Sequence, residues 1–445
     1  MFGDRRRRRR RRTALVLAGL VCLAAVGIGT TLSAPPPAAP LAPLPAPPKP
    51  SGGREVSPGD DLQKLIDEAE PGAILYLSPG SYPGPLSIQR PLTIWGPREA
   101  VVRSNGLGNT IDARADGVRL LGFSVDGSGD RPDKMDSAIH VEGDDFEARG
   151  LRIVRAYFGF VVEKSNRATL AGNEIVGDPS VAIGLRGDAI RFWETRDSVI
   201  KDNRVTDCRD VLVWYSPDNR IINNDISRGR YGTHFMYCDG GVIEGGLYRD
   251  NTVGIFVMYS RNVQARGNLT AGSASAGGMG LGVKDSGNLI IENNRFVQDQ
   301  VGIYLDNSPS RLGDRNRVEG NLITFCETGI VFHSSPARNE FLGNTFQANQ
   351  HQARVDGRGD ALETTWRGNA FDDYQGYDLD GDSFGDVPHE ARNLANQMIG
   401  RIPELAFFRG TPALGLLEAV GRIFPLFQPE AIFVDPQPRM KARGS

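Results

Sequence analysis

Three residues near the middle of the chain carry side chains that favour a soft metal ion. His234 supplies an imidazole, and Met236 and Met258 supply thioethers. This combination suits Cu(I), whereas zinc and magnesium prefer thiolates, further imidazoles or carboxylates. Cys238 is a candidate fourth ligand, although other repeats carry Ser or Thr at its position. The sequence therefore predicts a copper site at His234, Met236, Met258 and Cys238, if the fold brings these residues together.

The same residues are compatible with a docking surface for a partner protein. Large aromatic side chains border them in the repeat pattern, namely Trp193, Trp214, Phe256 and Tyr259. Methionine adapts well to protein contacts, and an exposed apolar patch is typical of an interface. Copper ligation and docking stay open as alternatives. Both apply if the metal is transferred, because a transfer site must also contact its recipient.

A loop near the C-terminus offers oxygen ligands for a different ion. Asp378, Asp380, Asp382 and Asp386 alternate with small or apolar residues. Such a loop suits Ca²⁺, which takes about six to eight oxygens. It is not a full EF-hand, because the glycine and the bidentate glutamate of that motif are missing at their positions. A bound Ca²⁺ and a solvated acidic turn are both compatible with this pattern.

A repeat must position these residues. Short phrases built around Asn or Gly and followed by apolar residues recur along the chain, roughly every 22 residues with insertions. Their landmark positions are Asn173, Asn203, Asn224, Gly246, Asn268, Asn294, Asn321, Asn344 and Asn369. This period predicts one coil of a parallel β-helix, in which the recurring asparagines stack and satisfy backbone groups of the turns. Leucine-rich repeats of this length would require leucines at fixed positions, and these are absent.

One strand of each coil shows alternating columns. Two columns are almost entirely apolar and are expected to point inward: Phe160, Ile190, Val211, Thr233, Ile255, Leu281, Ile303 and Ile330, and two residues later Val162, Phe192, Val213, Phe235, Val257, Val283, Leu305 and Phe332. The columns between and after them must point outward. Because coils stack about 4.8 Å apart, we expect Met236 and Met258 to be neighbours on an exposed face, with His234 beside them.

The predicted fold is an all-β, right-handed parallel β-helix with a short N-terminal capping helix and a helical C-terminal extension. Leu62, Leu65, Ile66 and Ala69 have helical spacing after an acidic start, so this segment is expected to cover the open first coil. Residues 402–434 are too apolar for a free tail. They are expected either to seal the last coil or to dock onto a membrane permease.

Four segments are expected along the chain: 1–33 an export signal or N-terminal anchor, 34–53 a Pro/Ala-rich linker, 54–375 the β-helix, and 376–445 the acidic loop with the apolar extension. The first segment contains eight of the arginines and Asp4, so its loss would change the net charge from −3 to −10. A chain this acidic argues against a broad nucleic-acid surface. The remaining cysteines are Cys208, Cys238 and Cys326, an odd number that leaves at least one thiol unpaired or intermolecular.

Several phrases resemble the NosD family, whose members are periplasmic accessory proteins of nitrous oxide reductase maturation. They lie at 187–193, 231–237, 253–260, 278–286, 302–309 and 376–388. The resemblance implies a β-helix of the carbohydrate-binding type and copper delivery toward nitrous oxide reductase. It also implies an ABC transporter partner with ATPase and permease subunits, a copper chaperone as a further partner, and a periplasmic location. There the chain would be free, or held at the inner membrane by an uncleaved N-terminus or by the permease.

Two other functions compete with this one. Parallel β-helices often modify polysaccharides, so a lyase, epimerase or hydrolase is the main rival, and it would need acid–base residues grouped on one outer face. Asp188, Arg191 and Glu194 are close in sequence, but the last two fall on different faces, and the Asp144–Asp145 pair is isolated. The signatures typical of polygalacturonases are absent, which favours a protein without catalytic activity. A scaffold that binds without a metal is the third possibility.

Overall fold

The computed structural model describes residues 44–335, 337–356, 361–392 and 431–440, together with 398, 402–408, 411–413 and 416. The expected export segment 1–33 and the first ten residues of the expected linker lie outside these ranges. The described residues all belong to one compact unit. Within the described residues, no helix has the length and apolar character needed to cross a membrane.

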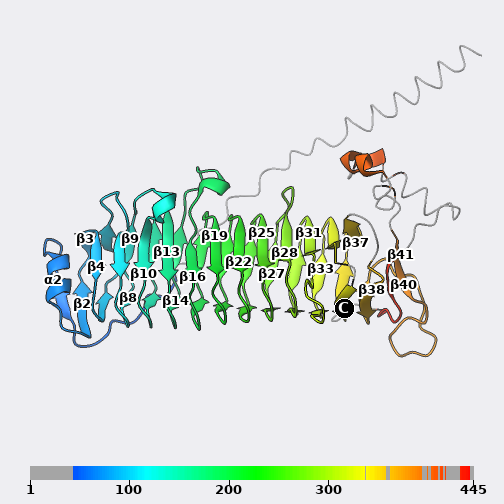
Figure 1. The fold of residues 1–445 in the computed structure, drawn as a ribbon, viewed down its shortest axis with the longest axis horizontal. Helices are drawn as coiled ribbons and strands as arrows, with labels where there is room; N and C mark the ends of the chain where they lie inside the picture. The colour runs from blue at the N-terminus through cyan, green and yellow to red at the C-terminus, as the bar shows by residue number, and fades with distance from the viewer. Residues whose placement is uncertain are drawn as a thin grey trace, which may run out of the picture. The chain divides into compact units, whose positions relative to one another are not determined.

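The described unit is a parallel β-helix, as predicted (Figure 1). Each coil contributes one strand to each of three parallel sheets. The 14-stranded sheet contains β1 (Arg54–Val56), β2 (Ala73–Leu77), β5 (Leu92–Trp95), β8 (Arg119–Leu121), β11 (Glu147–Arg149), β14 (Thr169–Ala171), β17 (Val199–Lys201), β20 (Arg220–Ile222), β23 (Val242–Glu244), β26 (Gln264–Arg266), β29 (Ile290–Glu292), β32 (Asn316–Glu319), β35 (Ala337–Leu342) and β38 (Glu363–Arg367).

The 12-stranded sheet carries the residues that could do chemistry. It contains β4 (Leu86–Ile88), β7 (Ile111–Ala113), β10 (Ser137–Val141), β13 (Phe158–Glu163), β16 (Ile190–Trp193), β19 (Asp210–Trp214), β22 (Tyr231–Met236), β25 (Val253–Met258), β28 (Met279–Lys284), β31 (Val301–Asp306), β34 (Thr328–His333) and β37 (His351–Asp356).

The 13-stranded sheet completes each coil. It contains β3 (Gly80–Pro83), β6 (Ala100–Arg103), β9 (Ser124–Asp126), β12 (Arg152–Val154), β15 (Glu174–Val176), β18 (Arg204–Thr206), β21 (Asp225–Ser227), β24 (Leu247–Arg249), β27 (Leu269–Ala271), β30 (Arg295–Val297), β33 (Leu322–Thr324), β36 (Thr345–Gln347) and β39 (Ala370–Phe371). Short 3₁₀ helices interrupt the connections at η1 (Pro132–Lys134), η2 (Ile183–Leu185) and η3 (Pro403–Phe408).

The core is the space enclosed by the three sheets. Both apolar columns of the 12-stranded sheet point inward as predicted, and each of their side chains is buried, from Phe160 and Val162 through Ile330 and Phe332. The strands stack in register, so that Phe160 pairs with Ile190 and Val162 with Phe192. A column of apolar side chains therefore runs through the coils, and its removal from water is the main force that holds them together.

Asparagines form a ladder at the turn before the 13-stranded sheet. Oδ1 of Asn203 accepts hydrogen bonds from the backbone N–H and the side-chain amide of Asn173, both at 2.9 Å. The same pattern links Asn294 to Asn321 and Asn321 to Asn344, and all these side chains are buried. The predicted stacking of the recurring asparagines is confirmed, and it satisfies turn N–H groups that would otherwise be unpaired.

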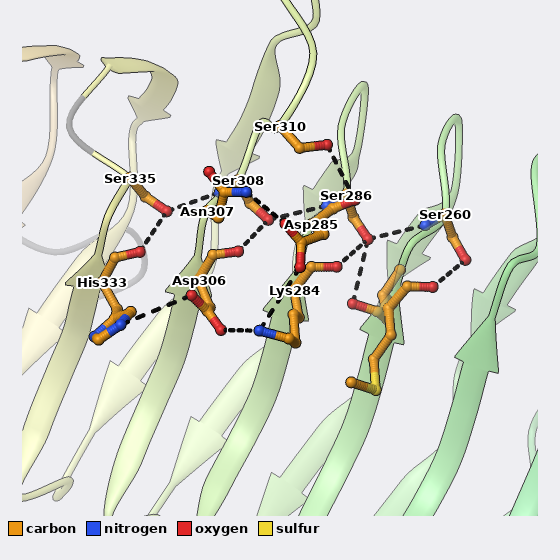
Figure 2. Close-up of polar contacts among 12 residues, drawn as sticks. Ser260, Lys284, Asp285, Ser286, Asp306, Asn307, Ser308, Ser310, His333 and Ser335 are labelled. Carbon is orange, nitrogen blue, oxygen red and sulfur yellow. Dashed lines mark hydrogen bonds and ion pairs between the residues drawn. The ribbon is translucent and has the colours of Figure 1, made fainter.

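A second ladder of side chains closes the turn after the 12-stranded sheet. Hydroxyls of successive coils accept hydrogen bonds from backbone N–H groups of the preceding coil, as from Ser260 to Ser286 at 3.0 Å and from Ser308 to Ser335 at 2.8 Å (Figure 2). Cys238 occupies this ladder: its Sγ accepts from the N–H of Ser216 at 3.4 Å. Its thiol is therefore committed to the turn.

Both open ends of the solenoid are covered. At the N-terminus, α2 (Leu62–Glu68) is capped by Asp61, whose carboxylate accepts a hydrogen bond from the N–H of Lys64 at 3.0 Å. The helix buries Leu62 and Ile66 against the first coil. This is the predicted capping helix. It is the only α-helix within residues 44–335 and 337–356.

The C-terminal end is capped by a strand pair. Within the predicted helical extension, the described residues include η3 and two antiparallel strands, β40 (His389–Arg392) and β41 (Ala431–Asp435). Phe433 is fully buried and stacks on Trp366 of the last coil with ring centroids 3.7 Å apart. A strand forms here because β41 buries Phe433 and still pairs its backbone. Residues 431–435 thus help to seal the last coil, and most of 409–430 lies outside the described residues.

A third ladder of side chains lies at the turn after the 13-stranded sheet, where Asp299 takes the position that asparagine holds at Asn251 and Asn349. Its carboxyl group makes the stability of the fold depend on pH. Burial raises the pKa of Asp299 to about 6, although hydrogen bonds from Thr270 and Ser273 oppose the shift. Because the folded pKa exceeds the unfolded value of 3.8, the protonated carboxyl stabilises the fold below pH 4, and this stabilisation is lost as the pH rises to 6. We expect Asp299→Asn to remove up to about 3 kcal/mol of pH dependence in this window.

Urea denaturation of both proteins at pH 4 and pH 7 measures this effect. Asn251 and Asn349 accept the equivalent N–H hydrogen bonds two coils away on either side, so asparagine fits the position. The prediction fails if the difference in unfolding free energy between the parent and Asp299→Asn is the same at both pH values.

Candidate functional site

The outer face of the 12-stranded sheet brings the predicted copper ligands together. Met236 on β22 pairs in register with Met258 on β25. His234 lies two residues before Met236 on the same strand and pairs with Phe256. The predicted neighbourhood of His234, Met236 and Met258 is therefore present in the structure, and we call these three residues the sulfur–histidine face.

The imidazole and one thioether are already in contact. Nε2 of His234 lies 3.2 Å from Sδ of Met258. The ring is wedged between Tyr231 and Phe256, with centroid separations of 4.9 Å and 5.9 Å, and the residue is only 6% exposed. Packing therefore restricts the histidine rotamer, and it directs one ring nitrogen toward sulfur.

Beneath His234 lies a buried carboxylate. Oδ2 of Asp210 is 3.6 Å from Nδ1 of His234, which is longer than an ordinary hydrogen bond. Arg230 binds both oxygens of Asp210 and holds it in place. Burial favours the neutral acid, but the nearby His234 and the hydrogen bonds of Arg230 outweigh it and lower the pKa of Asp210. An ionised carboxylate thus faces the second ring nitrogen, as is common behind metal-binding histidines.

Cys238 lies apart from the sulfur–histidine face. It is fully buried, and its Sγ is 3.2 Å from the carbonyl oxygen of Val213 and 3.3 Å from that of Met236. Burial raises the pKa of the Cys238 thiol to about 12, so the thiolate form that binds metals is disfavoured. Cys208 and Cys326 are also buried, unpaired thiols with pKa values raised to about 12.

Aromatic side chains border this face on its N-terminal side. Trp193 and Trp214 pack edge to face at 4.5 Å, and they stand in the same outward column as Met236. Beside them Tyr215, Tyr237 and Tyr259 form a stack with centroid separations of 4.9 Å and 4.8 Å. Tyr215 and Tyr237 are 46% and 41% exposed, so aromatic surface faces solvent next to the candidate ligands.

Charged residues border the face on its C-terminal side. The outward column continues from Met258 to Lys284, Asp306 and His333 (Figure 2). The ammonium of Lys284 lies 2.6 Å from Asp306, and Nε2 of His333 lies 4.0 Å from the same carboxylate. The thioethers therefore stand at the boundary between an aromatic surface and an ion-paired one.

A further methionine near this face was not predicted. Gly282 lies in register with Phe256, and a side chain at Gly282 would meet the Phe256 ring at 2.9 Å and Sδ of Met279 at 3.3 Å. The missing side chain of Gly282 therefore leaves space for a third thioether beside Phe256. The sequence signal that could have revealed it is the glycine within an otherwise filled column.

The acidic loop has a compact but open geometry. One carboxylate oxygen from each of Asp378, Asp380 and Asp382 lies within 4.8 Å of the others. These carboxylates accept hydrogen bonds from loop N–H groups, such as Gly381 to Asp378 at 2.7 Å. Asp386 instead accepts from the N–H of Leu379 at 2.6 Å. The calcium site at these four residues stays a prediction.

Three of the four acidic residues considered for sugar chemistry, Asp144, Asp145 and Asp188, are paired with arginines, whereas Glu194 is exposed. Arg209 binds both oxygens of Asp188, whose side chain is fully buried. The Asp144–Asp145 pair is bound by Arg167 and lies at a turn, where Asp145 has a positive φ. These ion pairs give the three aspartates a structural role in the β-helix.

Comparison with known proteins gives one family and one fold. A family model described as "Periplasmic copper-binding protein (NosD)" matches residues 171–376. A Pseudomonas aeruginosa protein named "Probable ABC transporter binding protein NosD" is 28% identical over 379 residues, which cover 79% of this chain and 84% of that protein. The protein of the same name from Stutzerimonas stutzeri is 26% identical over 381 residues, covering 82% of this chain and 86% of that protein.

Similar solved structures include polysaccharide-modifying enzymes. The A-module of the Azotobacter vinelandii mannuronan C-5 epimerase AlgE6 has a TM-score of 0.55 at 15% identity and covers 71% of this chain and 95% of that one. The Yersinia enterocolitica family 28 exopolygalacturonase has a TM-score of 0.51 at 10% identity and covers 74% and 79%. At this level of identity the likeness concerns the β-helix alone.

Proposed function

Because a NosD family model and two relatives named NosD match this chain, we propose that it is a member of that family, a periplasmic accessory protein that binds Cu(I) on the sulfur–histidine face and passes it on during maturation of nitrous oxide reductase. The observation that carries this proposal is the 3.2 Å contact between Nε2 of His234 and Sδ of Met258 on an outward-facing strand pair. The family description as periplasmic and copper-binding supports it.

The face has the chemistry that Cu(I) transfer needs. Two thioethers and one imidazole are soft, neutral ligands that prefer Cu(I) to Zn²⁺ or Mg²⁺. His234 is fixed by its aromatic neighbours, whereas Met236 and Met258 are partly exposed and flexible. The histidine would orient the ion, and the methionines would release it to an incoming ligand set. Asp210 acts as a positioning residue, since it faces Nδ1 of His234.

The bordering surfaces would receive the partners. The relatives' names refer to an ABC transporter, so we propose that permease and ATPase subunits act with this chain. A copper chaperone and nitrous oxide reductase would be the donor and the recipient of the ion. The exposed stack of Tyr215, Tyr237 and Tyr259 supports docking beside the copper ligands, because partly exposed aromatic side chains are enriched in interfaces. Anchoring at the inner membrane would keep the donor and recipient close.

Anaerobic titration with Cu(I) against a strong competing chelator tests the proposal. We expect the purified chain to bind one Cu(I) per molecule, because the structure offers one such face among its described residues. X-ray absorption should detect sulfur together with nitrogen around the ion. If the chain takes no copper from the chelator, the face is a docking surface and any copper must pass through the partners.

A further inference from the structure

A histidine surrounded by carboxylates lies on the same sheet face, several coils before His234. His140 on β10 pairs in register with Asp112 on β7. Glu142 follows on the same outward side, and Glu163 at the end of β13 lies beside it. One ligand atom from each of His140, Glu142 and Glu163 lies within 4.8 Å of the others. The His140 side chain is only 10% exposed, so a nearly buried imidazole faces this cluster.

Asp112 fixes the direction of the ring. Nδ1 of His140 lies 2.8 Å from Oδ1 of Asp112, which is a good hydrogen bond. Because Nδ1 donates to this carboxylate, Nε2 is the nitrogen left to face outward. A carboxylate that orients a histidine in this way stands behind most metal-binding imidazoles.

Nε2 stands at ligand distance from two glutamates rather than at hydrogen-bond distance. It lies 3.6 Å from Oε2 of Glu163 and 3.9 Å from Oε1 of Glu142. Hydrogen bonds would bring these atoms to about 2.7–3.2 Å. Two ligands of one tetrahedral Zn²⁺, at bond lengths of about 2.0–2.2 Å, are separated by about 3.4 Å. The distance from Nε2 to each glutamate oxygen is therefore within a few tenths of an ångström of the spacing between two ligands of one ion.

The excess negative charge around His140 also favours binding of a divalent cation. Asp112, Glu142 and Glu163 are acidic, and Arg114 binds Asp112 at 2.8 Å and Glu142 at 3.0 Å. With a neutral imidazole, three carboxylates against one guanidinium leave two negative charges.

We propose that His140, Glu142 and Glu163 form a second metal site, which takes a divalent cation of the Zn²⁺ type through nitrogen and oxygen ligands. Sulfur is absent from this set, so the site disfavours Cu(I). One imidazole with carboxylates also suits Zn²⁺ better than Ca²⁺ or Mg²⁺, which favour oxygen-only shells. Water would fill the fourth position. The sheet would then carry a nitrogen–oxygen site and a sulfur–nitrogen site on one face.

Competition between the metal-stripped full chain and a chromophoric Zn²⁺ chelator tests this site. We expect the parent to bind one Zn²⁺ and Glu142→Gln/Glu163→Gln to bind it at least about a hundredfold more weakly. Asp112→Asn, which alters only the orienting carboxylate, should weaken binding by about ten- to a hundredfold. His333→Ala is the matched control, because His333 faces a single carboxylate, Asp306, on the same sheet. The Zn²⁺ affinity of this variant should equal that of the parent.

X-ray absorption of the Zn²⁺-loaded parent separates this site from the sulfur–histidine face. The expected first shell contains nitrogen and oxygen only. Sulfur in the shell, equal affinity in the parent and Glu142→Gln/Glu163→Gln, or no binding by the parent would each overturn the proposal. The glutamine variants keep the size of the side chains, and circular dichroism verifies that they are folded.

Discussion

Changing Met236 and Met258 together to leucine should abolish competitive Cu(I) binding, with a loss of at least about 10³-fold in affinity, or about 4 kcal/mol. Two of the three proposed ligands disappear, and a lone imidazole holds Cu(I) weakly. Leucine keeps the volume and apolar character of methionine, so the fold and the docking surface should persist at a stability cost below about 1.5 kcal/mol. The measurement is the anaerobic competition titration with the parent and variant side by side.

This substitution separates the two functions that the sequence left open. If the face only docks a partner, leucine is an adequate replacement and association with the transporter subunits is retained, while copper binding does not change. If the face ligates copper, binding is lost although the patch stays apolar. Met279→Leu is the matched control, because its thioether lies over Gly282 near Phe256, and we expect its effect on affinity to be much smaller. A loss of similar size in Met279→Leu would move the site toward β28.

The repeat made the position of His234, Met236 and Met258 predictable. Strands alternate their faces with a period of two residues, and each coil of the helix repeats the same pattern. Knowing which columns are apolar therefore fixes which residues are neighbours one coil apart. The pairing of Met236 with Met258 follows from this logic alone. The fold class was predictable for the same reason, because only inward-facing apolar columns at each coil explain the pattern.

Other parts of the site depend on details that periodicity does not contain. Asp210 reaches His234 because the register between β19 and β22 shifts between Asp210 and Leu212. Met279 lies near Phe256 because Gly282 has no side chain. Such local departures from the repeat are invisible in the average pattern, and they arise from packing of individual residues.

The His140 cluster was missed for a related reason. Asp112 and His140 lie in coils before the first recurring phrase, where the coil length is irregular and the landmarks are absent. Sealing of the last coil by residues 402–434 was one of two predicted alternatives, but the strand pair was not predicted, because β40 and β41 pair across a long stretch of chain. Pairing between distant segments depends on closure of the intervening loop, and local sequence patterns give no measure of it.

A single asparagine of the buried ladder should contribute strongly to stability. We expect Asn321→Ala to lower the free energy of unfolding by about 3–5 kcal/mol. Oδ1 of Asn321 accepts from the N–H and the side chain of Asn294, and its amide donates to the carbonyl of Ile291 at 2.8 Å and to Asn344 at 3.0 Å. Alanine would leave these buried groups unpaired where no water replaces the amide.

Urea denaturation followed by circular dichroism measures this loss, with Asn105→Ala as the control. Asn105 accepts one exposed hydrogen bond from the N–H of Leu107, so its replacement should change stability by less than about 1 kcal/mol. Gly246 shows how the ladder tolerates a gap, because the Tyr248 ring fills the space of the missing side chain. No aromatic ring belongs to the hydrogen-bonded set around Asn321 that could fill a gap there in the same way. Equal stability of Asn321→Ala and the parent would therefore mean that the coils are held by their apolar columns alone.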